Sequence, residues 1–414
     1  MKKHTQSPCE RSEISYKPSG IKWLGEIPQS WENVSIRSCF TESNQRCNTD
    51  SYPLLSVTIA NGIIYQDNIE NKKDISNDDK SNYKIVPLNA VAYNKMRMWQ
   101  GAVGVNTLTT GIVSPAYIVA IPNEKILPNF VSYLFKSKIM ISEFDKNSYG
   151  LCLDMNNLRY DDFRNIKIPL PPLQEQKEIA EFLDKKCEKI QNYINKKQKL
   201  ITLLQEKKQA LINEVVTKGL NPNIEFKNSG IAYLGLIPHH WEVRRMKFMA
   251  SIHNGREQTE IADENGIYPI YGSGGILGKS MYFIYDKPSV LLGRKGTIDK
   301  PLFVEEPFWT IDTMFYTSVS KIVLPKYFYY LCLTIDFQFY ISGSAIPSMT
   351  QYDLANISFA LPPLQEQKQI ANFLDEKCEK INSAIEKTKK QIELVKEYKN
   401  TFINEAVCGR IRVN

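Results

Sequence analysis

Two short runs place basic side chains directly after apolar segments, where they could contact a polyanion. One run follows residues 90–92 and the other follows residues 290–292. Arginine and lysine at a strand end can hold phosphates or read guanine edges, and a nearby tryptophan can pack on a sugar or a base. An ordinary solvated turn explains the same spacing, so both interpretations stay open. The side chains concerned are Lys95, Arg97, Trp99, Arg294 and Lys295.

A glycine-rich run, YGSGGILGKS at residues 271–280, looks like a phosphate-binding loop but lacks the required spacing. Ser273 stands where a P-loop needs glycine, and Leu277 stands where a dinucleotide fingerprint needs it. Residues 281–285 read as a strand, whereas a bound phosphate needs the N-terminus of a helix. The run therefore predicts a β-turn or a surface loop.

Patterns for catalysis are missing from the sequence. We find no NPP[YF] tetrapeptide, no carboxylate cluster of a nuclease, no HxxxH and no glycine-flanked nucleophilic serine. Glu305 and Glu306 are adjacent, but on a strand their side chains would point to opposite faces. The four histidines lack ligand spacing and the eight cysteines contain no CxxC. We therefore expect a protein without enzymatic activity and without a metal site.

The net charge of +7 does not mark either half of the chain as basic. Residues 31–168 contain 15 Lys/Arg against 14 Asp/Glu, and residues 241–360 contain 11 against 12. Composition alone therefore does not establish DNA binding. The start of the chain has no apolar signal region, and no apolar run reaches the length of a membrane span. With unpaired, scattered cysteines, this predicts a soluble cytoplasmic protein.

The elements that would position these runs are duplicated. Residues 170–190 and 361–381 share 18 of 21 positions, and both begin LPPLQEQ. Paired prolines followed by glutamine and glutamate suit the first turn of a helix. Gly219 and Gly409 would end the two helices, each of about 45 residues and roughly 65 Å long at the usual rise per residue.

Each predicted helix carries an apolar seam of ten positions spaced alternately by four and three residues, interrupted by polar residues at the same two steps. Matched seams predict that the helices pair with each other. The alternative is two amphipathic helices that lie on separate cores, although such helices are usually shorter. The seam residues that we expect to pair or to bind partners are Leu183, Ile190, Ile194, Ile201, Leu204, Leu374, Ile381, Ile385, Ile392 and Phe402.

A second duplication precedes each variable block: SGIKWLGEIPQSWE at residues 19–32 recurs as SGIAYLGLIPHHWE at residues 229–242. Short strand-like segments with glycine, asparagine and proline between them fill both blocks, which predicts compact α/β or α+β domains. The predicted boundaries are a flexible extension at 1–18, a first domain at 19–169, a helix at 170–218, a second domain at 219–360, a helix at 361–409 and a tail at 410–414.

Together, the doubled helix, the doubled anchor peptide and the two dissimilar blocks resemble the specificity subunit of type I restriction-modification systems. The resemblance implies two α/β target-recognition domains, each reading one half of a bipartite double-stranded DNA site. It implies that the two long helices pair as an antiparallel coiled coil with pseudo-twofold internal repeat. It also implies binding to two modification subunits, which are adenine methyltransferases, and to restriction subunits, which are translocase-nucleases.

The resemblance also gives roles to particular residues. The glycine-rich run and the Gly-Arg-Lys-Gly turn look like recognition-domain segments, which adds Tyr271 and Ser273 to the candidate DNA contacts. S-adenosylmethionine, ATP and magnesium are expected on the partner subunits, and no cofactor on this chain. Two alternatives stay open: a coiled-coil scaffold without sequence specificity, and an enzyme with an unrecognised nucleotide or S-adenosylmethionine site. The helix-start residues that are similar to the family's partner-binding motif are Leu173, Gln174, Glu175, Gln176, Leu364, Gln365, Glu366 and Gln367.

Overall fold

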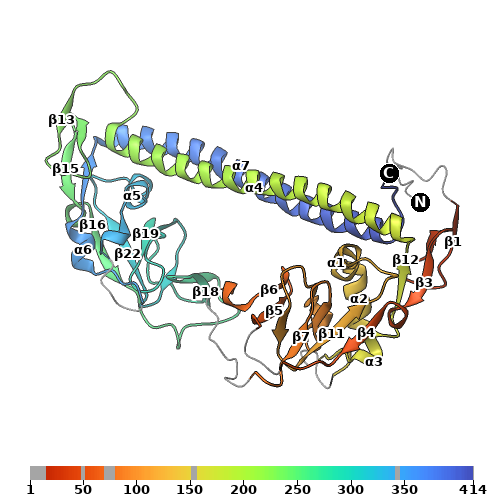
Figure 1. Ribbon diagram of the computed structural model, residues 1–414. Helices are drawn as coiled ribbons and strands as arrows, with labels where there is room; N and C mark the ends of the chain where they lie inside the picture. Colours follow the sequence, from red (N-terminus) through yellow and green to blue (C-terminus); the bar gives the residue numbers. More distant parts are fainter. Residues whose placement is uncertain (1–14, 48–51, 70–79, 151–155, 341–345, 414) are drawn as a thin grey trace. The chain divides into compact units, whose positions relative to one another are not determined.

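The computed structural model describes residues 15–47, 52–69, 80–150, 156–340 and 346–413 (Figure 1). Spatial contacts divide the chain into two compact units. Unit 1 contains residues 1–196 and 391–414, and unit 2 contains residues 197–390. The division passes through both long helices, so each unit includes part of each helix.

The two predicted helices are present as α4 (Leu173–Lys218) and α7 (Leu364–Val407). Gly219 and Gly409 follow them with φ of 76° and 70°, the left-handed conformation that ends a helix and that glycine adopts at low cost. Each helix begins three residues later than predicted. The preceding leucine of each motif belongs to a strand, and the two prolines separate that strand from the helix.

In unit 1 the beginning of α4 packs against the end of α7. Ile179 and Leu183 share one buried cluster with Ala406 and Val407. The ring of Phe182 on α4 lies 5.4 Å from the ring of Phe402 on α7.

In unit 2 the end of α4 packs against the beginning of α7. Ile212 and Val215 share a buried cluster with Ile370 and Leu374, and Lys208 Nζ donates a hydrogen bond of 2.9 Å to Asn382 Oδ1. The helix segments within each unit therefore run in opposite directions. All twenty seam positions predicted from the sequence are buried or half-buried.

Both units contain a four-stranded antiparallel sheet with the same strand order. After the second strand of that order, the chain enters a short helix that begins with proline: α1 (Pro128–Lys136) or α5 (Pro325–Cys332). The sheet of unit 1 has the order β4 (Phe40–Ser43), β11 (Tyr117–Pro122), β8 (Val91–Asn94) and β9 (Val103–Val105). The sheet of unit 2 has the order β16 (Ala250–Asn254), β22 (Met314–Val319), β19 (Ser289–Gly293) and β20 (Leu302–Val304).

Smaller strand pairs and short helices complete each unit, and among the described strands the only parallel pairing is that of β17 with β21. The pairs of unit 1 are β1 (Tyr16–Pro18) with β2 (Glu26–Pro28), β3 (Glu32–Ser35) with β12 (Lys167–Leu170), β5 (Leu55–Thr58) with β6 (Gly62–Tyr65), and β7 (Lys84–Val86) with β10 (Gly111–Val113). Those of unit 2 are β13 (Phe226–Asn228) with β14 (Leu236–Pro238), β15 (Glu242–Arg245) with β23 (Ser358–Leu361), and β17 (Tyr268–Gly272) with β18 (Gly275–Ser280) and β21 (Trp309–Thr310). The short helices are α2 (Lys138–Lys146), α3 (Tyr160–Phe163) and α6 (Gln351–Asn356), with 3-10 turns η1 (Ile36–Ser38), η2 (Gln66–Asn68), η3 (Met98–Gln100), η5 (Met246–Phe248) and η6 (Phe337–Tyr340).

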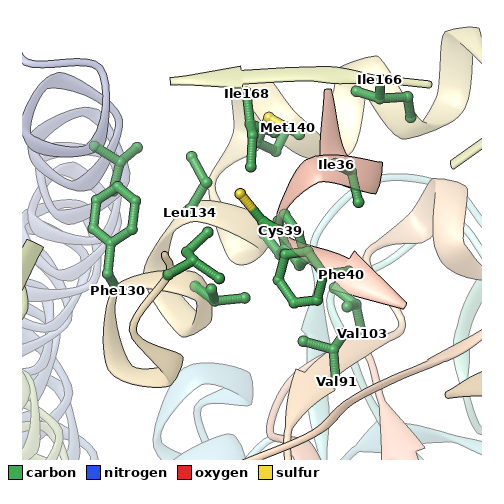
Figure 2. Close-up of a cluster of buried hydrophobic side chains, with 14 of the residues drawn as sticks. Ile36, Cys39, Phe40, Val91, Val103, Phe130, Leu134, Met140, Ile166 and Ile168 are labelled. Carbon is green, nitrogen blue, oxygen red and sulfur yellow. The ribbon is translucent and has the colours of Figure 1, made fainter. Parts of the chain in front are cut away.

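The main core of unit 1 lies between one face of its sheet and the helices α1 and α2. Figure 2 shows Phe130 and Leu134 of α1 together with Cys39, Phe40 and Val91 in this cluster, all fully buried or nearly so. The corresponding cluster of unit 2 is built from the sheet, α5 and the halves of the long helices. In the described part of the chain, no helix has the length and apolar character needed to cross a bilayer.

The flexible extension predicted at residues 1–18 includes residues that form a strand. Residues 1–14 lie outside the described part, but Tyr16–Pro18 form β1 and pair with β2. The Tyr16 hydroxyl donates a hydrogen bond of 3.0 Å to the Gly409 carbonyl, which ties this strand to the segment that follows α7.

Candidate nucleic-acid interface and its frame

In unit 2 the basic turn after β19 is held by the loop 311–313. The backbone N–H groups of Arg294 and Lys295 both donate to the Thr313 carbonyl, at 2.8 and 3.3 Å. The Arg294 guanidinium donates to the Asp312 carbonyl at 3.2 Å. Arg294 is half-buried and Lys295 is exposed. The turn therefore presents one oriented cation and one exposed cation.

The glycine-rich run joins the same loop, so the structure brings four predicted residues together. Ser273 N–H donates to Thr313 Oγ1 at 3.3 Å, and the Tyr271 carbonyl accepts from Ile311 N–H at 3.0 Å. The basic turn and the glycine-rich run also lie close together, because a Cβ atom at Gly296 would lie 3.0 Å from Ser273 Oγ. The run contains the end of β17, the predicted turn and β18, and is not a phosphate loop. Residues 281–285, predicted as a strand, lie outside the strands because the chain leaves the hairpin after Ser280.

Tyr271 is half-buried. Its ring meets Phe308 edge to face with centroids 6.2 Å apart. Burial, with a smaller contribution from the Glu306 carboxylate, raises the pKa of the Tyr271 hydroxyl. The hydroxyl is therefore neutral and can donate a hydrogen bond at physiological pH.

In unit 1 the basic turn follows β8, the strand that occupies the place of β19 in the equivalent sheet. Lys95 and Trp99 are half-buried and Arg97 is exposed. The Trp99 indole N–H donates to the Met96 carbonyl at 3.1 Å, which fixes the ring against its own turn. The candidates of unit 1 therefore lie in one turn, as do Arg294 and Lys295 in unit 2.

One backbone contact recurs behind both turns. The Lys95 carbonyl accepts from Leu158 N–H at 2.8 Å, and the Arg294 carbonyl accepts from Met349 N–H at 2.9 Å. Leu158 and Met349 each stand two residues before a short helix, α3 or α6. The two basic turns therefore occupy equivalent places in equivalent folds.

The helix-start motif forms a joint inside each unit. In unit 1, Gln176 is fully buried; its side-chain oxygen accepts from Leu127 N–H at 2.7 Å, and its amide donates to the carbonyls of Lys125 and Pro171. Gln367 makes the same three bonds in unit 2, to Leu324, Ile322 and Pro362. Burial leaves no surface of these two glutamines for a partner, which corrects the prediction that they bind one.

The glutamate of the motif binds the anchor peptide. Glu175 accepts from the Trp31 indole N–H at 2.7 Å, and Glu366 accepts from the Trp241 indole N–H at 3.0 Å. Both tryptophans are buried, at 2% and 0% exposure. The sequence contained the signal for this contact, because the tryptophan and the glutamate both recur in the two copies.

Leu173, Gln174, Leu364 and Gln365 are exposed at the starts of the helices. They remain available for a partner. Among the described residues, no group of three His, Cys, Asp or Glu side chains could hold a metal ion. A cavity of about 370 Å³ in unit 2 lies between α4, α5 and α7, with Lys208, Tyr329 and Glu386 in its wall, away from the glycine-rich run.

Comparison with known proteins decides the family. The family described as "Type I restriction modification DNA specificity domain" matches residues 28–205 and 238–394, which are most of the chain. The chain belongs to this family. DNA sequence specificity is the role of the type I specificity family.

Three relatives in the type I specificity family cover from 62% to 96% of the chain. The MjaX specificity subunit of Methanocaldococcus jannaschii is 25% identical and covers 96% of this chain and 98% of its own length. The MjaVIII specificity subunit of the same organism is 28% identical over 73% of this chain and 75% of its own length. The StySPI specificity subunit of Salmonella potsdam is 24% identical over 62% and 59%.

Solved structures show the same fold. A chain from a study of complex assembly and conformational transition of the type I R-M system has a TM-score of 0.71 at 15% identity, covering 92% of this chain and 98% of that one. The HsdS subunit of Thermoanaerobacter tengcongensis has a TM-score of 0.51 at 16% identity, with the same coverage.

Proposed function

We propose that the chain reads a bipartite double-stranded DNA site, one half with each unit, through the basic turns after β8 and β19. The observation that carries this proposal is the recurrence of a basic turn at the same strand end of two equivalent sheets, each held by the same backbone bond. Arginine and lysine at such a place can contact base edges in the major groove or phosphates beside it. The DNA contacts in this proposal are Lys95, Arg97, Trp99, Tyr271, Ser273, Arg294 and Lys295.

The long helices are the spacer in this proposal, pairing as an antiparallel coiled coil from end to end. The opposed helix segments within each unit and the burial of both seams support it. The boundaries proposed for the recognition domains are 19–169 and 219–360.

The partners in this proposal are two modification subunits and restriction subunits. The exposed residues at the helix starts, Leu173, Gln174, Leu364 and Gln365, are the proposed contacts with the modification subunits. S-adenosylmethionine, ATP and magnesium would be bound by the partners. This chain would then direct methylation without catalysing it.

The experiment is to map methylated adenines in the DNA of cells that express the chain with its modification subunit. One methylated motif with two specified halves and an unread spacer is the expected result. Methylation without a sequence motif would favour a scaffold without specificity. Tight binding of S-adenosylmethionine or ATP by the isolated chain would favour an enzyme instead.

A further inference from the structure

In unit 1 a single lysine joins the β5–β6 hairpin to the basic turn. Lys136, the last residue of α1, donates hydrogen bonds from Nζ to the carbonyls of Thr58 and Ile59 at 3.1 and 2.7 Å. It also donates to the carbonyl of Gly101 at 3.0 Å. Thr58 is the last residue of β5, Ile59 begins the hairpin turn, and Gly101 ends the 3-10 turn that contains Trp99.

In the described part of the chain, hydrogen bonds to backbone carbonyls, and not an ion pair, hold the Lys136 ammonium group in place. Within the described ranges, no carboxylate forms an ion pair with Lys136, and burial lowers its pKa to about 8. An ammonium group has three N–H donors, and here each meets one backbone carbonyl. Burying a charge is costly unless hydrogen bonds compensate, so the arrangement requires the three carbonyls to stay in place.

The rest of the hairpin lies directly on the sheet. A Cβ atom at Gly104 of β9 would lie 2.8 Å from the backbone nitrogen of Ile63, so the hairpin and the strand touch backbone to backbone. The turn of the hairpin is tight, since Thr58 Oγ1 accepts from Asn61 N–H and donates to the Gly62 carbonyl. This packing leaves Ile59 48% exposed at the tip.

We propose that Lys136 is a positioning residue for DNA reading by unit 1, and that the hairpin tip with Ile59 is part of the reading surface beside Arg97. Lys136 bonds both Ile59 and Gly101, and the neighbouring Ala102 N–H donates to the Arg97 carbonyl, which brings the tip to the segment of the basic turn. An exposed aliphatic side chain suits a base edge that carries a methyl group, such as thymine in the major groove. The proposal rests on the function proposed above.

In unit 2 the hairpin is joined to the basic turn without a lysine. Because α1 and α5 begin at equivalent prolines, Leu333 occupies the place of Lys136. Thr313 takes over the bridging role, since it bonds Ser273 in the hairpin turn as well as Arg294 and Lys295. The half-site read by unit 2 is therefore an internal control for any change at Lys136.

The experiment compares Lys136→Met with Lys138→Met in the full complex. Lys138 is an exposed lysine two residues away. Methylated sites are mapped, and base preference is scored at each position of both half-sites. Lys136→Met is expected to lower discrimination at one or more positions of one half-site by about 10-fold, the size expected for removing one base contact, and to leave the other half-site unchanged. Lys138→Met should match the parent.

A second variant, Ile59→Ala, changes only an exposed side chain and should relax the same half-site. It decides the outcome if Lys136→Met fails to assemble. The proposal is overturned if Lys136→Met assembles and reads the same bases as the parent, or if Ile59→Ala does. If the parent itself methylates without a sequence motif, the proposed function has failed, and not only the role of Lys136.

Discussion

The two units share a frame, which consists of the four-stranded sheet, the helix-start motif and the anchor peptide. They differ in the hairpins that are attached to this frame. Each has the same sheet order, the same buried glutamine at the helix start and the same bond between tryptophan and glutamate. The added strands differ: unit 1 packs its β5–β6 hairpin on β9 through Gly104, whereas unit 2 attaches the β17–β18 hairpin to β21. The glutamine, glutamate and tryptophan that make these contacts are identical in the two units.

The difference has a physical basis. A buried amide such as Gln176 has no alternative partner, so changing it leaves several backbone groups unpaired. A hairpin tip such as Ile59 has solvent on one side, so its side chain can be replaced without leaving a buried backbone group unpaired. The frame can therefore be kept while the proposed reading surface is replaced, and substitutions in each part can test that separation.

The largest effect is expected at the seam. Ile392 is 5% exposed, and Ile392→Asp would place a carboxylate between the helices at a cost of several kcal/mol. Loss of thermal stability and of the partner complex should follow. Leu394→Asp is the matched control, because Leu394 is 56% exposed on the same helix. Equal melting temperatures for the two variants would show that the seam is not a buried contact.

The buried glutamine at the helix start should contribute equally to the stability of both units. Gln176→Ala and Gln367→Ala each leave buried backbone groups unpaired, so each should lower the free energy of unfolding by about 1–3 kcal/mol. Gln174→Ala, at an exposed neighbour, should change it little. Denaturant unfolding measures all three. A large cost in only one unit would break the equivalence of the two frames.

The basic turns should act one half-site at a time. Replacing Arg294 and Lys295 by alanine should weaken binding by about 1–3 kcal/mol for each base contact that the substitution removes, at one half-site only. Lys287 and Lys300, both exposed in the same unit, provide a charge-matched double control. Binding titrations with DNA altered in either half-site test this. Unchanged recognition of both halves would assign the two residues to a plain turn.

The smallest effect concerns pH. The folded pKa of Lys136 is lowered from 10.5 to about 8, so between these values the unfolded chain binds more protons than the folded chain. The contribution of Lys136 to the free energy of unfolding should therefore rise with pH from about 8 to 10.5. The slope of the free energy of unfolding against pH should therefore be lower in Lys136→Met than in the parent across this range. Parallel curves for the parent and the variant would contradict the lowered pKa.

Much of the frame could be predicted because its signals are local and periodic. The alternating steps through Leu183, Ile194 and Ile392 identified positions that are buried, and Gly219 and Gly409 marked the helix ends. The backbone contacts of the buried glutamines could not be predicted. Gln176 forms hydrogen bonds with the backbone of residues 125 and 127, about 50 positions earlier. No sequence pattern predicts a backbone partner at that separation.

The proposed reading surface could be predicted from the sequence only in part. The strand-end position of Arg294 and of Lys95 was visible in the sequence, as was the failure of the glycine run to match a phosphate loop. The bridging groups were not visible. Lys136 and Thr313 act by bonding the backbones of other segments, and their own side-chain types carry no signal of that use.

We propose that the long helices set the distance between the two half-sites that the units read. Inserting Leu-Gln-Glu-Lys after Lys207 would add about 6 Å of helix, close to two base-pair steps of duplex. Methylated sites would be mapped in cells that carry either version with the same modification subunit. We expect both half-site sequences to stay the same while the unread spacer between them lengthens by one or two base pairs. An unchanged spacer with full activity, or altered half-site bases, would contradict this role of the helices.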